Sequence, residues 1–166
     1  MNYITAQNLL EHLGKSELRM SIIGKLDADL DADLLSLVVT GGDITAFQAE
    51  PISEANRALT LINNAITAST NLMNGYIPKR HNLPLASEVV ASSPLPGISI
   101  KLVRYELALT INDQLSNDKK EALQQLRDIA KGLIVLGSED PQNTQAAGTV
   151  RVSRNNQSSL TDGFGR

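Results

Sequence analysis

The stretch SEANRALTLINNAITASTNLMNGY, residues 53–76, decides the fold class of this chain. Its apolar side chains recur at steps of three and four residues, which places them along one face of an α-helix. We expect Ser53 to cap this helix and Pro78 to end it, because the residue before a proline disfavours helical backbone. The predicted helix covers about six turns. Its apolar stripe comprises Ala55, Leu59, Ile62, Ala65, Ile66, Leu72, Met73 and Tyr76.

Two further amphipathic segments follow, and with the first they predict an all-α domain. Residues 98–115 are apolar over more than half of the helical circumference, as a central helix would be. Residues 118–136 carry one apolar stripe opposite a charged face, with Asn117 or Asp118 as the N-cap and Gly137 just beyond the end. This second stripe comprises Ala122, Leu126, Ile129, Ala130, Leu133 and Leu136.

The N-terminal part predicts shorter helices. One follows Thr5 and ends at Gly14, and a second short helical turn ends at Gly24. Residues 25–49 have two interpretations: leucines at three- and four-residue steps fit a helix, whereas LLSLVV at residues 34–39 alone fits a strand. We favour the helix.

The remaining segments predict connections rather than helices. Residues 78–97 contain four prolines, so we expect an ordered or semi-ordered connector. Residues 138–166 are rich in Ser, Asn, Gln, Thr and Gly, and cannot bury enough apolar surface to offset roughly 1–2 kcal/mol of backbone ordering per residue. The expected architecture is a small helical bundle over residues 1–137, followed by a long extended C-terminal arm over 138–166.

Composition excludes several classes of protein. The chain has 166 residues and no cysteine, so disulfides, thiolate metal sites and cysteine nucleophiles are absent, which suits a reducing cytosol. Its net charge of -3 argues against a protein whose main task is to grip phosphates. No apolar run is long enough to span a membrane, and the N-terminus lacks the basic leader of a signal peptide.

No motif supports catalysis or metal binding. The acidic run DADLDADLL fails as a calcium loop, because Ala32 or Leu34 falls where an EF-hand requires glycine. His12 and His81 are the only histidines, and a surface loop explains His81 best. No GxSxG elbow and no phosphate-binding glycine loop occurs. We therefore expect no catalytic, cofactor-binding or metal-binding residues, and no enzymatic activity.

The segment NNAITASTNLMNGYIPKRHNLPL, residues 63–85, resembles a signature of the Mu-like phage neck proteins. In that family a helix is followed by Tyr-Leu-x-x-Arg-Tyr-x-Leu-Pro-Leu. Here Ile77 replaces the first leucine and His81 replaces the second tyrosine. The other matching positions are Tyr76, Arg80, Leu83, Pro84 and Leu85.

Three more stretches resemble the same family in the same order. Arg104 and Tyr105 match its Ala-Arg-Tyr-x-Leu helix, and residues 126–132 resemble its closing helix, which ends in isoleucine-alanine-x-glycine. Arg151 with residues 158–164 resembles its C-terminal ending. The opening of the chain is similar without the family's Arg-Phe pair, and residues 25–52 are longer and more apolar than the family pattern.

This resemblance implies a head–tail connector located in the neck of the virion and made in the host cytoplasm. It implies a ring of about twelve copies that docks under the portal protein and meets a stopper or tail-completion protein. DNA would pass through the ring without sequence-specific binding, and the acidic balance of the chain is compatible with such a conduit.

Roles for the matched residues follow from the resemblance and their chemistry. Leu83, Pro84 and Leu85 would pin the connector onto the helices, because leucines can bury and proline needs no backbone donor partner. Arg104 and Tyr105 would be hydrogen-bonded structural groups on an apolar helix.

The arm carries the expected partner-binding residues. Two valines alternate with polar residues at strand spacing, and two apolar side chains follow, as in a segment that adds to a neighbour's sheet edge or groove. We expect them to contact the portal or a neighbouring subunit. They are Val150, Arg151, Val152, Leu160 and Phe164.

A second function remains open at this point. A small cytosolic helical binding module, antitoxin-like or chaperone-like, with a disordered tail, has the same composition and helix pattern.

Overall fold

The computed structural model describes residues 2–26 and 29–137. These residues form seven α-helices and one 3-10 helix without any strand, so the all-α prediction is confirmed. The predicted arm, residues 138–166, lies outside the described residues. In chain order the helices are α1 Ala6–Leu13, α2 Lys15–Ile23, α3 Ala32–Thr40, α4 Ala49–Asn74, η1 Ile77–Lys79, α5 Ser87–Ser92, α6 Leu95–Leu107 and α7 Asp113–Lys131.

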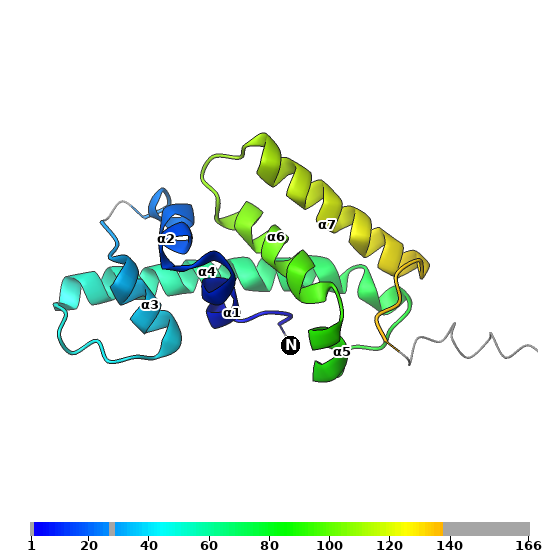
Figure 1. Cartoon of the computed structure of the whole chain (residues 1–166), viewed down its shortest axis with the longest axis horizontal. Helices are drawn as coiled ribbons and strands as arrows, with labels where there is room; N and C mark the ends of the chain where they lie inside the picture. Colours follow the sequence, from blue (N-terminus) through cyan, green and yellow to red (C-terminus); the bar gives the residue numbers. More distant parts are fainter. Residues whose placement is uncertain (1, 27–28, 138–166) are drawn as a thin grey trace, which may run out of the picture.

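Helix α4 runs along the length of the described domain (Figure 1). Helices α1, α2 and α3 gather near its N-terminal half and form a first core with it. Helix α6 packs against α4, and α7 packs on α6. Where α4 and α6 cross, the buried Ser69 and Ser99 hydroxyl oxygens lie 3.2 Å apart, so small side chains let the two helices approach closely.

A second core joins the C-terminal end of α4 to η1, α5, α6 and α7. It is built from side chains that are distant in sequence, including Tyr3 from the segment before α1. Its buried members are Tyr3, Met73, Ile77, Val90, Leu95, Ile98, Leu102, Ala122, Leu126, Ile129 and Leu136.

The first short helix begins and ends as predicted, and the second ends at the predicted Gly24. Thr5 caps α1, and its side chain accepts a hydrogen bond from the Asn8 backbone N–H. The ambiguous segment is also helical: α3 begins after Asp31, whose carboxylate accepts from the N–H groups of Asp33 (2.7 Å) and Leu34 (3.0 Å). The acidic run therefore contributes a helix cap, which satisfies otherwise unpaired donors.

The boundaries of the three long helices differ from the predicted ones. Helix α4 begins at Ala49 rather than after Ser53, with Pro51 in its first turn, where a missing N–H has no consequence. Helix α6 ends at Leu107, well before residue 115. The N-cap of α7 is Asn112 rather than Asn117 or Asp118, and its side chain accepts from the Leu115 N–H at 2.8 Å.

The connector over residues 78–97 is more helical than predicted. It contains α5 and the first turn of α6, and its Leu83–Pro84 peptide bond is cis. Helix α5 has only six residues and no side-chain cap, so its sequence carries little periodic signal. Pro96 lies in the first turn of α6, which explains why this proline does not interrupt the helix.

Candidate functional site

Arg80 of the family signature lies against the C-terminal end of α7. Its Nη1 donates to the Lys131 carbonyl oxygen at 3.4 Å. Gly132 follows with φ of +76°, in the left-handed region that favours glycine. A Cβ atom on Gly132 would lie 2.0 Å from Nη1 and 2.3 Å from Cζ of Arg80. The guanidinium therefore covers a glycine backbone, and this Arg80–Gly132 contact links two separate family motifs.

The rest of this signature surrounds the second core. Tyr76 and Leu85 are partly buried against it. Leu83 is 39% exposed, so the expectation that both leucines bury applies to Leu85 alone. Leu83, Pro84 and Leu85 line a small indentation together with Tyr3.

Tyr3 connects the N-terminal segment to α4. Its hydroxyl donates to Asn74 Oδ1 at 2.6 Å, and burial raises the pKa of this phenol above its usual range. The pairing satisfies a polar group at the edge of the second core. The N-terminal segment is thus fixed next to the signature region.

Arg104 and Tyr105 lie on α6 and join it to its neighbours. Arg104 Nη2 is 2.7 Å from Glu17 Oε1 on α2, and Nη1 is 3.9 Å from Asp118 Oδ2 on α7. The Lys119 ammonium lies 3.6 Å from the centroid of the Tyr105 ring. These contacts hold α2, α6 and α7 together with partly exposed groups, and such pairs each contribute on the order of 1 kcal/mol or less.

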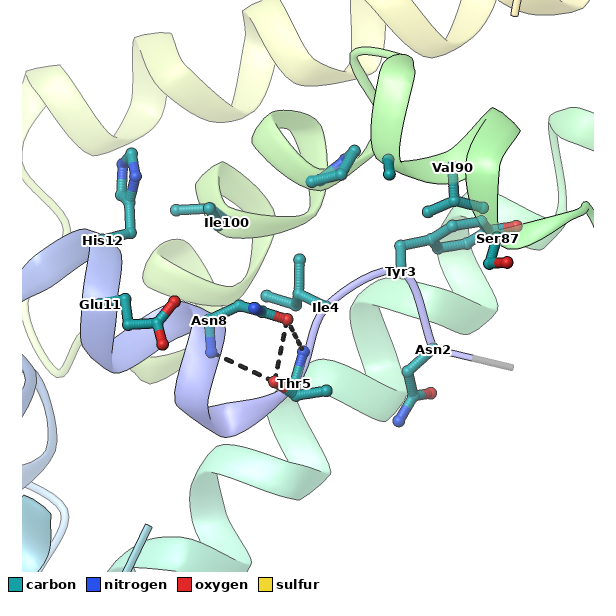
Figure 2. A pocket seen from close by; sticks show the side chains of 12 residues that line it. Asn2, Tyr3, Ile4, Thr5, Asn8, Glu11, His12, Ser87, Val90 and Ile100 are labelled. Carbon is teal, nitrogen blue, oxygen red and sulfur yellow. Dashed lines mark hydrogen bonds between the residues drawn. The ribbon is translucent and has the colours of Figure 1, made fainter. Parts of the chain in front are cut away.

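A hollow of about 550 Å³ lies beside the N-terminal segment, α1 and α5 (Figure 2). Its capping groups already bond one another: the Thr5 N–H donates to Asn8 Oδ1 at 3.0 Å, and the Asn8 N–H donates to Thr5 Oγ1 at 3.2 Å. Glu11 and His12 belong to the lining as well. In residues 2–26 and 29–137, no group of three or more His, Asp or Glu side chains could hold a metal ion.

Sequence reasoning missed two sets of exposed apolar side chains. Met20, Leu109 and Ile111 lie on α2 and on the loop between α6 and α7, and are 47–66% exposed. Leu133 and Val135 follow α7 and are 73% and 51% exposed. Leu133 was expected in the buried stripe, which is wrong because α7 ends at Lys131, with Gly132 rather than Gly137 as its left-handed terminator. The sequence signal for this earlier end of α7 was Gly132, which directly follows Lys131.

The predicted partner-binding residues of the arm remain a prediction, because all of them lie outside the described residues. They are Val150, Arg151, Val152, Leu160 and Phe164.

Comparison with known proteins identifies the family. Residues 3–154 match the family model described as Bacteriophage Mu, Gp36. No curated protein and no solved structure matches the chain. In the part of the chain that the structure describes, no helix is long and apolar enough to cross a membrane. Because the matched residues span most of the chain, the protein belongs to the Bacteriophage Mu Gp36 family.

Proposed function

We propose that this phage structural or assembly protein is a head–tail connector of the virion neck. The observation that carries the proposal is the match to a Mu-phage family over residues 3–154, which joins the helical domain to most of the arm segment. In this role, copies form a ring under the portal, extend the DNA conduit and present a surface to a stopper or tail-completion protein. The chain has no catalytic role.

Charge and fold support a conduit protein. The net charge of -3 avoids strong attraction to the phosphates of the DNA that passes through. The described domain is a set of helices with two well-packed cores, which suits a rigid building block. Polar side chains at its helix junctions form local bonds and ion pairs, as between Arg104 and Glu17.

The arm supplies the docking contact in this proposal. It has 29 residues after Gly137, and at ~3.3 Å per extended residue it is long enough to cross a neighbouring subunit. Its alternating valines and later apolar side chains are suited to pairing with an edge or groove of the portal or of an adjacent copy.

Truncation after Gly137 tests this docking role. Heads assembled without the protein are mixed with either the full chain or residues 1–137, then sedimented and joined to purified tails. The full chain is expected to sediment with the heads and restore tail joining. The truncated chain is expected to retain its helical circular dichroism signal, dock poorly and leave heads that leak DNA. Equal docking by both chains would contradict the role of the arm, and docking by neither would contradict the connector role.

The alternative is a small cytosolic helical binding module, antitoxin-like or chaperone-like. The open hollow next to α1 and α5 favours it, because a partner segment could occupy such a surface. The two proposals differ in the fate of the chain: a connector enters the mature virion, whereas a binding module remains in the infected cell.

A further inference from the structure

We infer that, in the free protein, residues 150–154 of the arm seat in the hollow beside α1 and α5 of their own chain. This hollow has a volume of about 550 Å³ and is here named the α1–α5 hollow. The seating concerns one isolated molecule, so it holds or fails independently of the connector role.

The α1–α5 hollow has an apolar floor and a polar rim. Ile4, Val90 and Ile100 are buried and form the floor, whereas Glu11 and Ser87 are exposed at the rim. The lining side chains come from the N-terminal segment, α1, α5 and α6 (Figure 2). The volume lies within the ~300–1,000 Å³ of typical ligand sites. The hollow is therefore large enough to take several side chains of a peptide segment.

A smaller hollow of about 360 Å³ adjoins the first one. Tyr3 and Val90 line both hollows, and Asn74 with residues 83–85 completes the second. The two hollows therefore form one track that passes α5. A track of this kind suits an extended segment, whose alternate side chains enter successive depressions.

The described chain ends against the wall of this track. Leu136 is buried in the same core as Tyr3 and Val90. A Cβ atom on Gly137 would lie 3.6 Å from Cγ2 of Val89 on α5, at ordinary van der Waals distance. Helix α5 has six residues and is ~9 Å long. The arm therefore starts on the short helix that also lines the hollow.

The length of the arm permits a return to the hollow. Val150 comes 13 residues after Gly137, a stretch that spans up to ~43 Å when extended. This exceeds the length of α5 several times, so the chain has enough slack to reverse direction. A short linker gives an effective concentration on the order of millimolar, so the chain's own segment outcompetes other copies at lower protein concentrations.

The sequence Val-Arg-Val-Ser-Arg at residues 150–154 matches the order of groups in the hollow. In an extended backbone alternate side chains share one face, so Val150, Val152 and Arg154 would face the same way. A chain that enters from α5 would place the two valines over the apolar floor first. Arg154 would then reach α1, where Glu11 lies at the rim.

Charge supports this orientation. Residues 141–161 contain two arginines and no carboxylate. The lining of the α1–α5 hollow contains one carboxylate, Glu11, beside His12, and no lysine or arginine. Glu11 accepts a hydrogen bond from Gln7 Nε2 at 3.0 Å and forms no ion pair with another described residue. An exposed ion pair contributes little free energy, so it would orient the segment while the valines supply most of the affinity.

The family match selects this part of the arm. It covers residues 3–154, from Tyr3 in the hollow to Arg154, and it stops before Leu160 and Phe164. The matched unit therefore includes the valine segment together with the helical domain, and leaves out the later apolar side chains. This favours residues 150–154 as the occupant.

Seating would cover Val150 and Val152 until the portal or another copy offers a better surface. In the connector proposal, docking then exchanges one covered state of the arm for another. An occupied hollow also removes the observation that favours a binding module.

Cysteine crosslinking in the full chain tests the seating, because the natural chain has no cysteine. The double variant Ala91→Cys/Ser153→Cys places one thiol at the exposed edge of the hollow and one next to Val152. It is treated with a short bis-maleimide at low protein concentration, and crosslinked peptides are quantified by mass spectrometry. We expect internal crosslinks to form several-fold faster than in the control Arg127→Cys/Ser153→Cys, whose thiol on α7 is exposed and also within reach of the arm.

Two further changes identify the groups responsible. Val150→Ser/Val152→Ser should slow crosslinking of the Ala91→Cys/Ser153→Cys chain to the control rate, and Glu11→Gln should slow it by a smaller factor. A rate equal to that of the control in the otherwise natural chain would overturn the inference.

A mixture of the two single variants, Ala91→Cys and Ser153→Cys, reports seating on another copy. We expect few crosslinked dimers, and dimers as the main product would overturn seating in the same chain. No heads are present in these reactions, so the outcome is separate from the test of the connector role.

Discussion

Replacing Ile129 with aspartate is expected to leave the chain largely unfolded at room temperature. Ile129 is 0% exposed and lies in the second core, on the face of α7 that packs on α6. The variant loses the buried isoleucine side chain and places a carboxylate in an apolar site. Together these effects cost about 4 kcal/mol or more, a large part of the ~5–15 kcal/mol that stabilises a typical domain.

Circular dichroism and thermal melting would measure this loss. Asn117→Asp is the matched control, because it introduces the same side chain at an exposed position of the same helix. Its free energy of unfolding should change by less than about 0.5 kcal/mol. A cooperative melt of the Ile129 variant close to that of the natural chain would show that α7 does not contribute to the core in solution.

Replacing Gly132 with alanine is expected to destabilise the domain through its positive φ, with a smaller added cost for displacing the Arg80 guanidinium. The positive φ alone costs an alanine about 1–2 kcal/mol. In addition, the new Cβ would come within 2.0 Å of Arg80 Nη1, so the guanidinium must leave its place over α7. Urea unfolding should report the sum of both terms.

Gly41 supplies the control for this experiment. Its φ is +71° at the end of α3, and nothing lies within 4 Å of an added Cβ, so Gly41→Ala carries the backbone cost alone. The change in unfolded-chain entropy is the same at both sites and cancels. In an Arg80→Ala background, Gly132→Ala should fall to the cost seen at Gly41. Equal costs at the two glycines in the natural background would show that the Arg80–Gly132 contact contributes no measurable stability.

Local periodicity predicted the helices, and tertiary contacts set several of their boundaries. Helix α4 was recognisable because its apolar stripe recurs over many turns. Its start was missed because the true N-cap, Gln48, makes no side-chain hydrogen bond, whereas Ser53 is a residue type that commonly caps helices. The end of α7 was missed because Leu133 and Leu136 continue the three-residue spacing beyond Gly132. Leu136 is buried in the second core although it lies beyond the end of α7.

The candidate site was less predictable than the fold. Arg80 and Lys131 are 51 residues apart, so no local pattern reveals that the guanidinium covers the end of α7. The family resemblance named Arg80 and the closing glycine separately, and only the folded chain brings them together. The exposure of Leu109 gives no sequence signal, because the sequence of a loop does not distinguish a buried apolar residue from an exposed one.

Electron cryo-microscopy of purified virions, with the chain fused to a small folded tag, tests the central claim most directly. A connector predicts ring-shaped density between portal and tail, with tag density at that ring alone and several copies per particle. If the tag is absent from virions, or lies away from the neck, the protein is not a head–tail connector.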